Sequence, residues 1–141
     1  MSLDASVGLR KGALELDVHL EVEGDDVVVL LGPNAAGKTT LLRALAGLVP
    51  LERGRVTLDG ALLEDAAAGV RVPTERRPIG VVFQDYLLFP HMTALQNVAY
   101  GPRSRGVPRP MARARALELL DRVGLTDIAA VKPRALSGGQ A

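Results

Sequence analysis

Residues Gly32 to Thr40 form the stretch of this chain in which residue types and spacing point most directly to chemistry. They read Gly-Pro-Asn-Ala-Ala-Gly-Lys-Thr-Thr and match the phosphate-loop pattern G-x-x-x-x-G-K-[ST] in full. Gly32 and Gly37 allow backbone angles that a side chain disfavours, so that successive N–H groups can turn toward an anion. Lys38 supplies a mobile positive charge, and the Thr39 hydroxyl is a ligand suited to Mg²⁺. The motif predicts binding of a nucleoside triphosphate together with Mg²⁺.

The whole loop is expected to line the phosphates, and its context supports this prediction. Val27 to Leu31 before the loop is apolar throughout, and Lys38 to Leu48 after it has a helical pattern that ends before Pro50. The alternative, a chance match on a glycine-rich turn, is disfavoured because both flanking elements are predicted. The residues predicted to bind the nucleotide are Gly32, Pro33, Asn34, Ala35, Ala36, Gly37, Lys38, Thr39 and Thr40.

Composition sets the broad class of the protein. The chain has 141 residues, enough for one domain with a core, and 48% of them are hydrophobic and 23% charged, as in ordinary globular proteins. The net charge of +1 gives no argument for nucleic acid, and no aromatic residue lies among the arginines from Arg103 to Arg115, which we interpret as a solvated surface. The sequence has no cysteine, and no apolar run approaches the ~20 residues that a membrane helix needs.

Several segments are predicted to be strands. Strict alternation from Leu14 to Val22 predicts a half-exposed strand, with His19 on its polar side and expected simply to be exposed. Val27 to Leu31 and Ile79 to Phe83 are apolar throughout, which predicts two buried strands. Gly54 to Gly60 predicts a short strand followed by a turn.

The later part of the chain is predicted to be mainly helical. Thr93 is a candidate N-cap for a short helix from Ala94 to Ala99. Gly101 to Pro110 is interpreted as a loop, and Met111 to Val123 predicts a second helix that Gly124 ends. All aromatic residues fall near the start of this part, where core packing and a docking surface both remain open; they are Phe83, Tyr86, Phe89 and Tyr100.

These elements predict a two-part organisation. Strands and helices that follow a phosphate loop indicate an α/β nucleotide-binding core, in which Ala61 to Pro78 is interpreted as a loop. The change to helical composition near Asn97 indicates a second lobe. We therefore predict a core over residues 1–96 and a helical subdomain over residues 97–141.

Two further motifs give the chain a resemblance to a known family. Leu136 to Gln140 reads Leu-Ser-Gly-Gly-Gln and resembles the LSGGQ signature of ATP-binding-cassette (ABC) proteins. Gln84 resembles the glutamine of that family's Q-loop, and the run from Gly80 to Gly101 looks like the ATPase subunits of bacterial importers. Gly54 to Gly60 also resembles the strand and turn of these subunits. The resemblance extends from about Leu14 to Ala141, with the motifs in the family's order.

The resemblance implies a fold, a set of partners and roles for residues. The fold would be α/β, a P-loop NTPase (ABC ATPase) core with a mixed sheet plus a helical lobe. Gln84 would be the catalytic residue that positions water and contacts Mg²⁺, with Thr39 as the other metal ligand. A second ABC ATPase subunit would complete the site in a head-to-tail dimer through Ser137, Gly138, Gly139 and Gln140, which would bind its nucleotide in trans.

The resemblance also implies partner subunits and a cellular location. Such subunits bind transmembrane permease subunits and lie peripherally on the cytoplasmic face of the inner (plasma) membrane. No nucleic-acid partner is expected. An intact member would be an ABC-type transport ATPase, which couples ATP hydrolysis to uptake of a solute.

The chain departs from the family pattern in two ways. It stops at Ala141, before the family's Walker B strand, catalytic Glu and switch His, so we expect an N-terminal portion, incomplete at the C-terminus and inactive alone. Val27 to Leu31 would then leave an exposed apolar edge. In addition, no aromatic precedes Phe83 to stack on adenine, and Val7 or Leu9 would lie near that place.

The leading hypothesis is the ATP-binding and ATP-hydrolysing subunit of an ABC importer. Thr74 to Arg77 and Gln84 to His91 look most like systems for molybdate or a related oxyanion. The alternative is a nucleotide-binding fragment without hydrolysis, because the later catalytic motifs are absent. A soluble ABC protein of DNA repair would need a large insertion that is not visible, and no Asn-Lys-x-Asp motif favours a GTPase.

Overall fold

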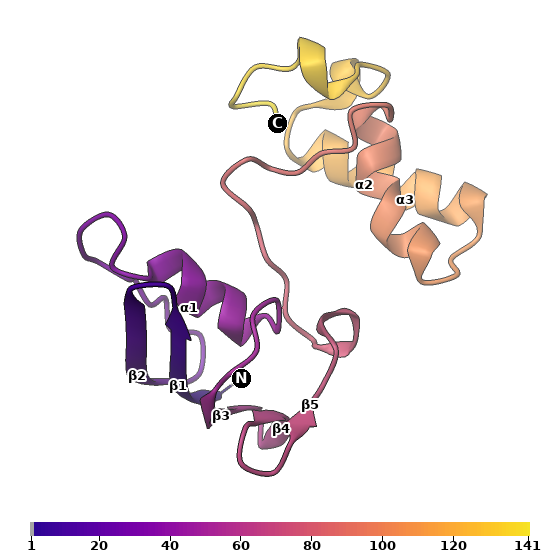
Figure 1. Cartoon of the computed structure of the whole chain (residues 1–141). Helices are drawn as coiled ribbons and strands as arrows, with labels where there is room; N and C mark the ends of the chain where they lie inside the picture. Colours follow the sequence, from indigo (N-terminus) through magenta and orange to yellow (C-terminus); the bar gives the residue numbers. More distant parts are fainter. Residues whose placement is uncertain (1) are drawn as a thin grey trace. The chain divides into compact units, whose positions relative to one another are not determined.

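The chain forms two compact units in the computed structural model (Figure 1). The structure describes residues 2–141. The first unit extends to Val81, the second comprises residues 82–141, and each is described by itself. The subdomain division after residue 96 rests on composition, and it stays a prediction.

The first unit is built on a five-stranded sheet in the order β2-β1-β3-β4-β5. The α/β class is confirmed, but each described pairing is antiparallel, so the sheet is not mixed as expected. The reason is that the apolar segments expected as buried strands do not join it. Its strands are β1 (Leu3–Lys11), β2 (Leu14–Val22), β3 (Arg53–Leu58), β4 (Ala61–Asp65) and β5 (Val70–Arg71).

The hairpin of β1 and β2 confirms the predicted strand from Leu14 to Val22 and adds a strand that was not predicted. The two strands pair along their whole length, from Leu3 opposite Val22 to Lys11 opposite Leu14. Gly12, with a φ of 61°, starts the two-residue turn between them, because glycine adopts this left-handed backbone at little cost. The strand β3 confirms the one predicted after Gly54.

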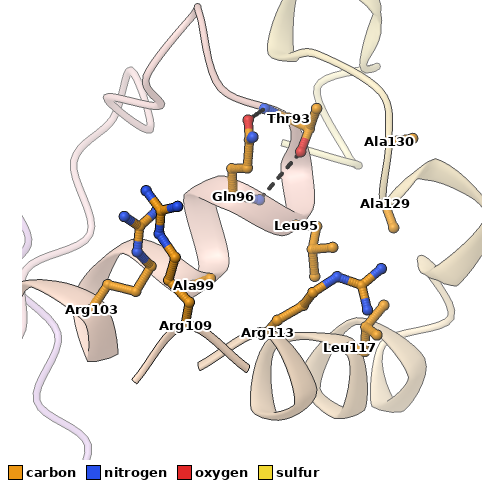
Figure 2. A pocket seen from close by; sticks show the side chains of 10 residues that line it. All are labelled: Thr93, Leu95, Gln96, Ala99, Arg103, Arg109, Arg113, Leu117, Ala129 and Ala130. Atoms are coloured by element: carbon orange, nitrogen blue, oxygen red, sulfur yellow. Dashed lines mark hydrogen bonds between the residues drawn. The ribbon is translucent and has the colours of Figure 1, made fainter. Parts of the chain in front are cut away.

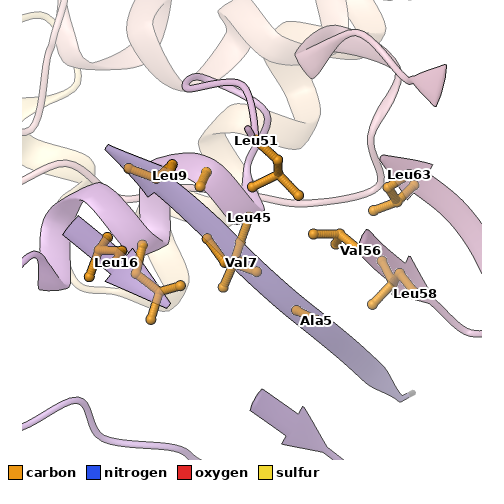
Figure 3. Close-up of a cluster of buried hydrophobic side chains, with 11 residues drawn as sticks. Ala5, Val7, Leu9, Leu16, Leu45, Leu51, Val56, Leu58 and Leu63 are labelled. Atoms are coloured by element: carbon orange, nitrogen blue, oxygen red, sulfur yellow. The ribbon is translucent and has the colours of Figure 1, made fainter. Parts of the chain in front are cut away.

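The core of the first unit lies between one face of the sheet and α1 (Lys38–Leu45) (Figure 3). Ala5 on β1 lies opposite Val56 on β3, and both are completely buried. The helix contributes Leu41 and Leu45 to the same cluster. Burial of each such leucine or valine is worth about 1.5–3 kcal/mol, and it fixes α1 on the sheet.

The two predicted buried strands are wrong. Val27 to Leu31 and Ile79 to Phe83 have no strand structure. Val27 is 89% exposed, Leu31 88% and Val82 90%. A buried strand needs hydrogen-bonding neighbours and covering elements, and no described residue pairs with either segment. Val27, Val28, Val29 and Leu31 are exposed, whereas Leu30 packs against the core; because the segment is not a strand, the expected exposed strand edge stays a prediction.

The loop predicted over Ala61 to Pro78 is also wrong. This segment contains β4, β5 and the 3₁₀ helix η1 (Thr74–Arg76). The pattern was missed because β5 has only two residues and because β4 carries the buried carboxylate of Glu64, which breaks the usual apolar pattern.

The second unit is helical, with α2 (Ala94–Ser104), α3 (Arg109–Arg122) and the 3₁₀ helices η2 (Thr126–Ile128) and η3 (Pro133–Ala135). The predicted cap at Thr93 is confirmed, since its hydroxyl accepts from the backbone N–H of Gln96 at 3.3 Å and the Gln96 side chain accepts from the backbone N–H of Thr93 at 2.8 Å. The helix α2 runs on into the loop predicted from Gly101, and it includes Pro102. None of the helices described over residues 2–141 has the length and apolarity needed to cross a bilayer.

A buried ion pair joins the C-terminal end of α1 to β4. The side chains of Arg77 and Glu64 are 0% and 3% exposed, and they form a salt bridge. The Arg77 guanidinium also donates to the carbonyl oxygens of Leu45 and Val72, each at 2.9 Å. Glu64 in turn accepts from the backbone N–H of Leu51 at 2.9 Å. Each charge is therefore compensated in a place that water does not reach.

Replacing Arg77 by Leu should lower the free energy of unfolding by about 3–5 kcal/mol, because the Glu64 carboxylate then stays buried without its partner. Urea unfolding followed by circular dichroism measures the change. Arg76→Leu is the matched control, since Arg76 is adjacent and exposed. Equal unfolding midpoints for the two variants would show that the ion pair does not hold the unit together.

Candidate functional site

The phosphate loop lies directly before α1, and Gly37 is the N-cap of this helix. Gly37 has a φ of 92°, and its carbonyl oxygen accepts from the N–H of Leu41 at 2.8 Å, which begins the helix. No side chain caps the first turn. The N–H groups of this turn are therefore available to an anion, and the helix dipole adds a partial positive charge there.

Gly37 is required for its size as well as for its backbone angle. A Cβ atom at this position would lie 2.7 Å from Leu16 Cδ2 and 3.2 Å from Leu14 Cδ2, both on β2. The start of α1 thus rests directly on β2, and any side chain would push the two apart. This contact sets the place of the loop relative to the sheet.

The Lys38 side chain folds back over the loop. Its Nζ donates to the carbonyl oxygens of Gly32 at 2.8 Å and Pro33 at 2.7 Å. An ammonium group has three N–H donors, so these two bonds leave one for an anion. The neighbouring Thr39 side chain is exposed. The arrangement brings a positive charge, free backbone amides and a hydroxyl to one place, which suits phosphate and an associated Mg²⁺ ion.

The two residues near the place of the family's adenine-stacking aromatic are not on the surface. Val7 and Leu9 are buried in the core of the sheet, where they pack with Leu45 and other apolar residues. They face the interior because β1 alternates and its odd-numbered residues point inward. Neither side chain can therefore contact a nucleotide base at the surface.

Gln84 lies in the second unit, in an exposed turn from Gln84 to Leu87. Tyr86 and Leu87 follow it with φ angles of 55° and 49°, a backbone that non-glycine residues adopt at a cost. The phosphate loop belongs to the first unit. Its roles toward water and Mg²⁺ stay predictions.

The residues Ser137, Gly138, Gly139 and Gln140 form an exposed turn after η3. The backbone N–H of Ser137 donates to the Gln140 side-chain oxygen at 3.0 Å, and the N–H of Ala141 donates to the Ser137 carbonyl at 3.1 Å. The second bond has the spacing of an α-helical turn. Both glycines are exposed, and a Cβ added at either would meet nothing within 4 Å. Their binding in trans stays a prediction.

Two features of the second unit were not specified by the sequence. Phe89 packs on Tyr100 with ring centroids 4.4 Å apart, which favours the packing role for these aromatics. A pocket of about 500 Å³ is lined by Arg103, Arg109 and Arg113 over an apolar wall (Figure 2). These arginines are exposed, as expected of a solvated surface, but the pocket depends on how α2 and α3 pack, which sequence alone does not give.

Gly37→Ala should reduce the free energy of unfolding by at least about 2 kcal/mol, because backbone strain adds to the clash with Leu16. Gly60→Ala is the matched control, since Gly60 has a similar φ of 75° but a Cβ added there would meet nothing within 4 Å. It should lose only about 1 kcal/mol from strain. Thermal or urea unfolding of both variants gives the comparison, and equal losses would rule out the contact with β2.

Comparison with known proteins shows the family. The model of the ABC transporter family matches residues 16–141. The chain is 49% identical over 124 residues to the Fe(3+) ions import ATP-binding protein FbpC of Streptomyces coelicolor, covering 88% of this chain and 34% of that protein. It is 46% identical over 130 residues to the molybdenum import ATP-binding protein ModC of Mycobacterium tuberculosis, covering 89% and 35%.

A further relative is named for the import of a third kind of solute. The spermidine/putrescine import ATP-binding protein PotA of Haemophilus influenzae is 48% identical over 124 residues, covering 88% of this chain and 32% of that protein. The chain thus spans about a third of the length of the curated relatives it matches. Its phosphate loop, the matched family model and these similarities agree, and the chain belongs to the ABC transporter family.

Proposed function

We propose that this chain is the nucleotide-binding part of the ATP-binding subunit of an ABC importer. The single observation that carries the proposal is the phosphate loop, where Lys38 is held over carbonyls of Gly32 and Pro33 at the open start of α1. The names of its relatives, all import ATP-binding proteins, support the same role.

ATP would bind along the loop from Gly32 to Thr40. The amides at the start of α1 would hold the phosphates, and Lys38 would exchange one or both carbonyl partners for phosphate oxygens. Mg²⁺, when bound, neutralises phosphate charge. Thr39 would be one of its ligands, and Gln84 would be another and would position water.

The partners follow from the same proposal. A second copy of the subunit would offer Ser137, Gly138, Gly139 and Gln140 to the nucleotide in a head-to-tail dimer. Their exposed turn and open glycines support this role. Transmembrane permease subunits would hold the dimer at the cytoplasmic face of the membrane, as import requires.

The proposed solute is molybdate or a related oxyanion. The support is the likeness of the Gln84 to His91 segment to such systems and the 46% identity to a molybdenum import protein. Relatives of similar identity are named for iron and for spermidine and putrescine, so the solute has to be tested directly. Cells that lack the gene should accumulate less molybdenum, with iron and polyamine contents unchanged. Loss of iron or polyamine uptake instead would reassign the solute.

Lys38→Ala should weaken binding of MgATP by roughly 10–100-fold, because a charge-assisted bond to phosphate is worth about 1.5–3 kcal/mol. Titration of a fluorescent ATP analogue into the full chain measures this affinity. Lys11→Ala serves as control, since Lys11 is an exposed lysine of the same unit outside the loop. Affinities that agree within about twofold between Lys38→Ala and the control would reject the loop as the binding site.

Phosphate release in the same samples separates hydrolysis from binding. We expect the 141-residue chain to bind MgATP without turning it over. Turnover that Lys38→Ala abolishes would instead make the chain an ATPase by itself.

A further inference from the structure

The outer face of the hairpin carries three side chains of metal-binding type, away from the phosphate loop. Asp4 lies on β1, and His19 and Glu21 lie on β2. Each offers one ligand atom, and these atoms all lie within 4.8 Å of one another. All three residues are exposed, so an ion could reach them from solvent.

The strand register places two negative charges face to face. Asp4 is directly opposite Glu21, and like charges in this position destabilise an antiparallel pair. Over residues 2–141, the ion pairs within 4.0 Å include no lysine or arginine bound to either carboxylate. Arg55, which lies opposite Ser6 on the neighbouring strand, forms no ion pair among the described residues.

At the other end of the same face, arginines neutralise the acidic side chains. The Arg53 guanidinium lies 3.7 Å from the carboxylates of both Glu15 and Asp17, and Arg10 lies 3.3 Å from Glu15. Gly8 leaves room for this, because a Cβ there would come within 3.0 Å of the Arg53 side chain. The sheet therefore neutralises its acidic residues with arginine at one end, whereas at the other end the acidic pair is accompanied by an imidazole.

The His19 ring lies between a hydroxyl and a carboxylate. Its Nδ1 is 3.0 Å from the Ser6 hydroxyl, and its Nε2 is 3.0 Å from a Glu21 carboxylate oxygen. Both contacts are ordinary hydrogen bonds when the Ser6 hydroxyl donates to Nδ1 and Nε2–H donates to Glu21. A metal ion bound by Nε2 would take the place of that proton, with Nδ1–H then donating to the Ser6 hydroxyl. A hydrogen bond to the second ring nitrogen is also the usual way in which a metal-binding histidine is held.

We propose that Asp4, His19 and Glu21 form a surface site for a divalent cation of the zinc type. One imidazole nitrogen and two carboxylate oxygens suit Zn²⁺, whereas Mg²⁺ and Ca²⁺ prefer oxygen ligands alone. At metal–ligand distances of about 2.0–2.2 Å, tetrahedral ligands lie roughly 3.4 Å apart. Small rotations of exposed side chains close the remaining gap. The fourth position would be left to water.

The test is isothermal titration of Zn²⁺ into the tag-free full chain without nucleotide. We expect one site, lost or weakened at least about tenfold in His19→Ala, because even loss of a supporting residue typically costs about 10–100-fold in affinity. His91→Ala is the matched control, since His91 is the chain's other histidine and lies in the second unit. Two further variants test the carboxylates. Asp4→Asn should weaken Zn²⁺ binding, whereas the control Asp17→Asn should not.

Nuclear magnetic resonance of the imidazole rings distinguishes binding of Zn²⁺ at His19 from binding of a proton. Zn²⁺ should shift the His19 ring signals and leave those of His91 in place. Unchanged His19 signals, or Zn²⁺ binding that is the same in His19→Ala as in the native chain, would overturn the proposal. Because the three side chains are exposed, their variants should retain the circular dichroism spectrum of the native chain, which verifies the comparison.

Discussion

The buried ion pair between Glu64 and Arg77 is the interaction on which the first unit depends. A guanidinium and a carboxylate without contact to water are tolerated only when each has partners of opposite charge and complementary hydrogen bonds. Arg77 finds them in Glu64 and in carbonyls at the end of α1, and the close packing leaves no room for a side chain at Gly47, where a Cβ would lie 2.5 Å from Arg77 Nε. The pair thus fixes the C-terminal end of α1 against β4.

The opposite end of α1 carries the proposed nucleotide site, so one end of this short helix is fixed by the ion pair and the other end is the candidate for binding phosphate. At the N-terminal end, Gly37 sits against leucines of β2, and Lys38 lies over carbonyls of its own loop. The helix has only eight residues and is marginal by itself. Its place comes from the core beneath it, the ion pair at one end and the glycine contact at the other. These three contacts fix α1, and with it the phosphate loop at its start, on the sheet.

The sheet likewise separates two kinds of chemistry on its two faces. Inward residues such as Ala5 and Val56 form the core, whereas outward residues carry charges that must be balanced in pairs. Where arginines form ion pairs with the acidic side chains, the charges are balanced within the sheet. Around Asp4, His19 and Glu21 they are not, and this local excess of negative charge is what marks the outer face as a place for a cation.

The sequence by itself determined the phosphate loop, the family, the hairpin strand from Leu14 and the cap at Thr93, because each is written in local spacing and in hydrogen bonds between near neighbours. Tertiary structure decided the rest. Val27 to Leu31 has the composition of a buried strand, but burial requires partner strands, and none of the described residues supplies one. The pairing of Glu64 with Arg77 and the meeting of Asp4 with Glu21 join residues distant along the chain, and only folding brings their charges within reach of one another.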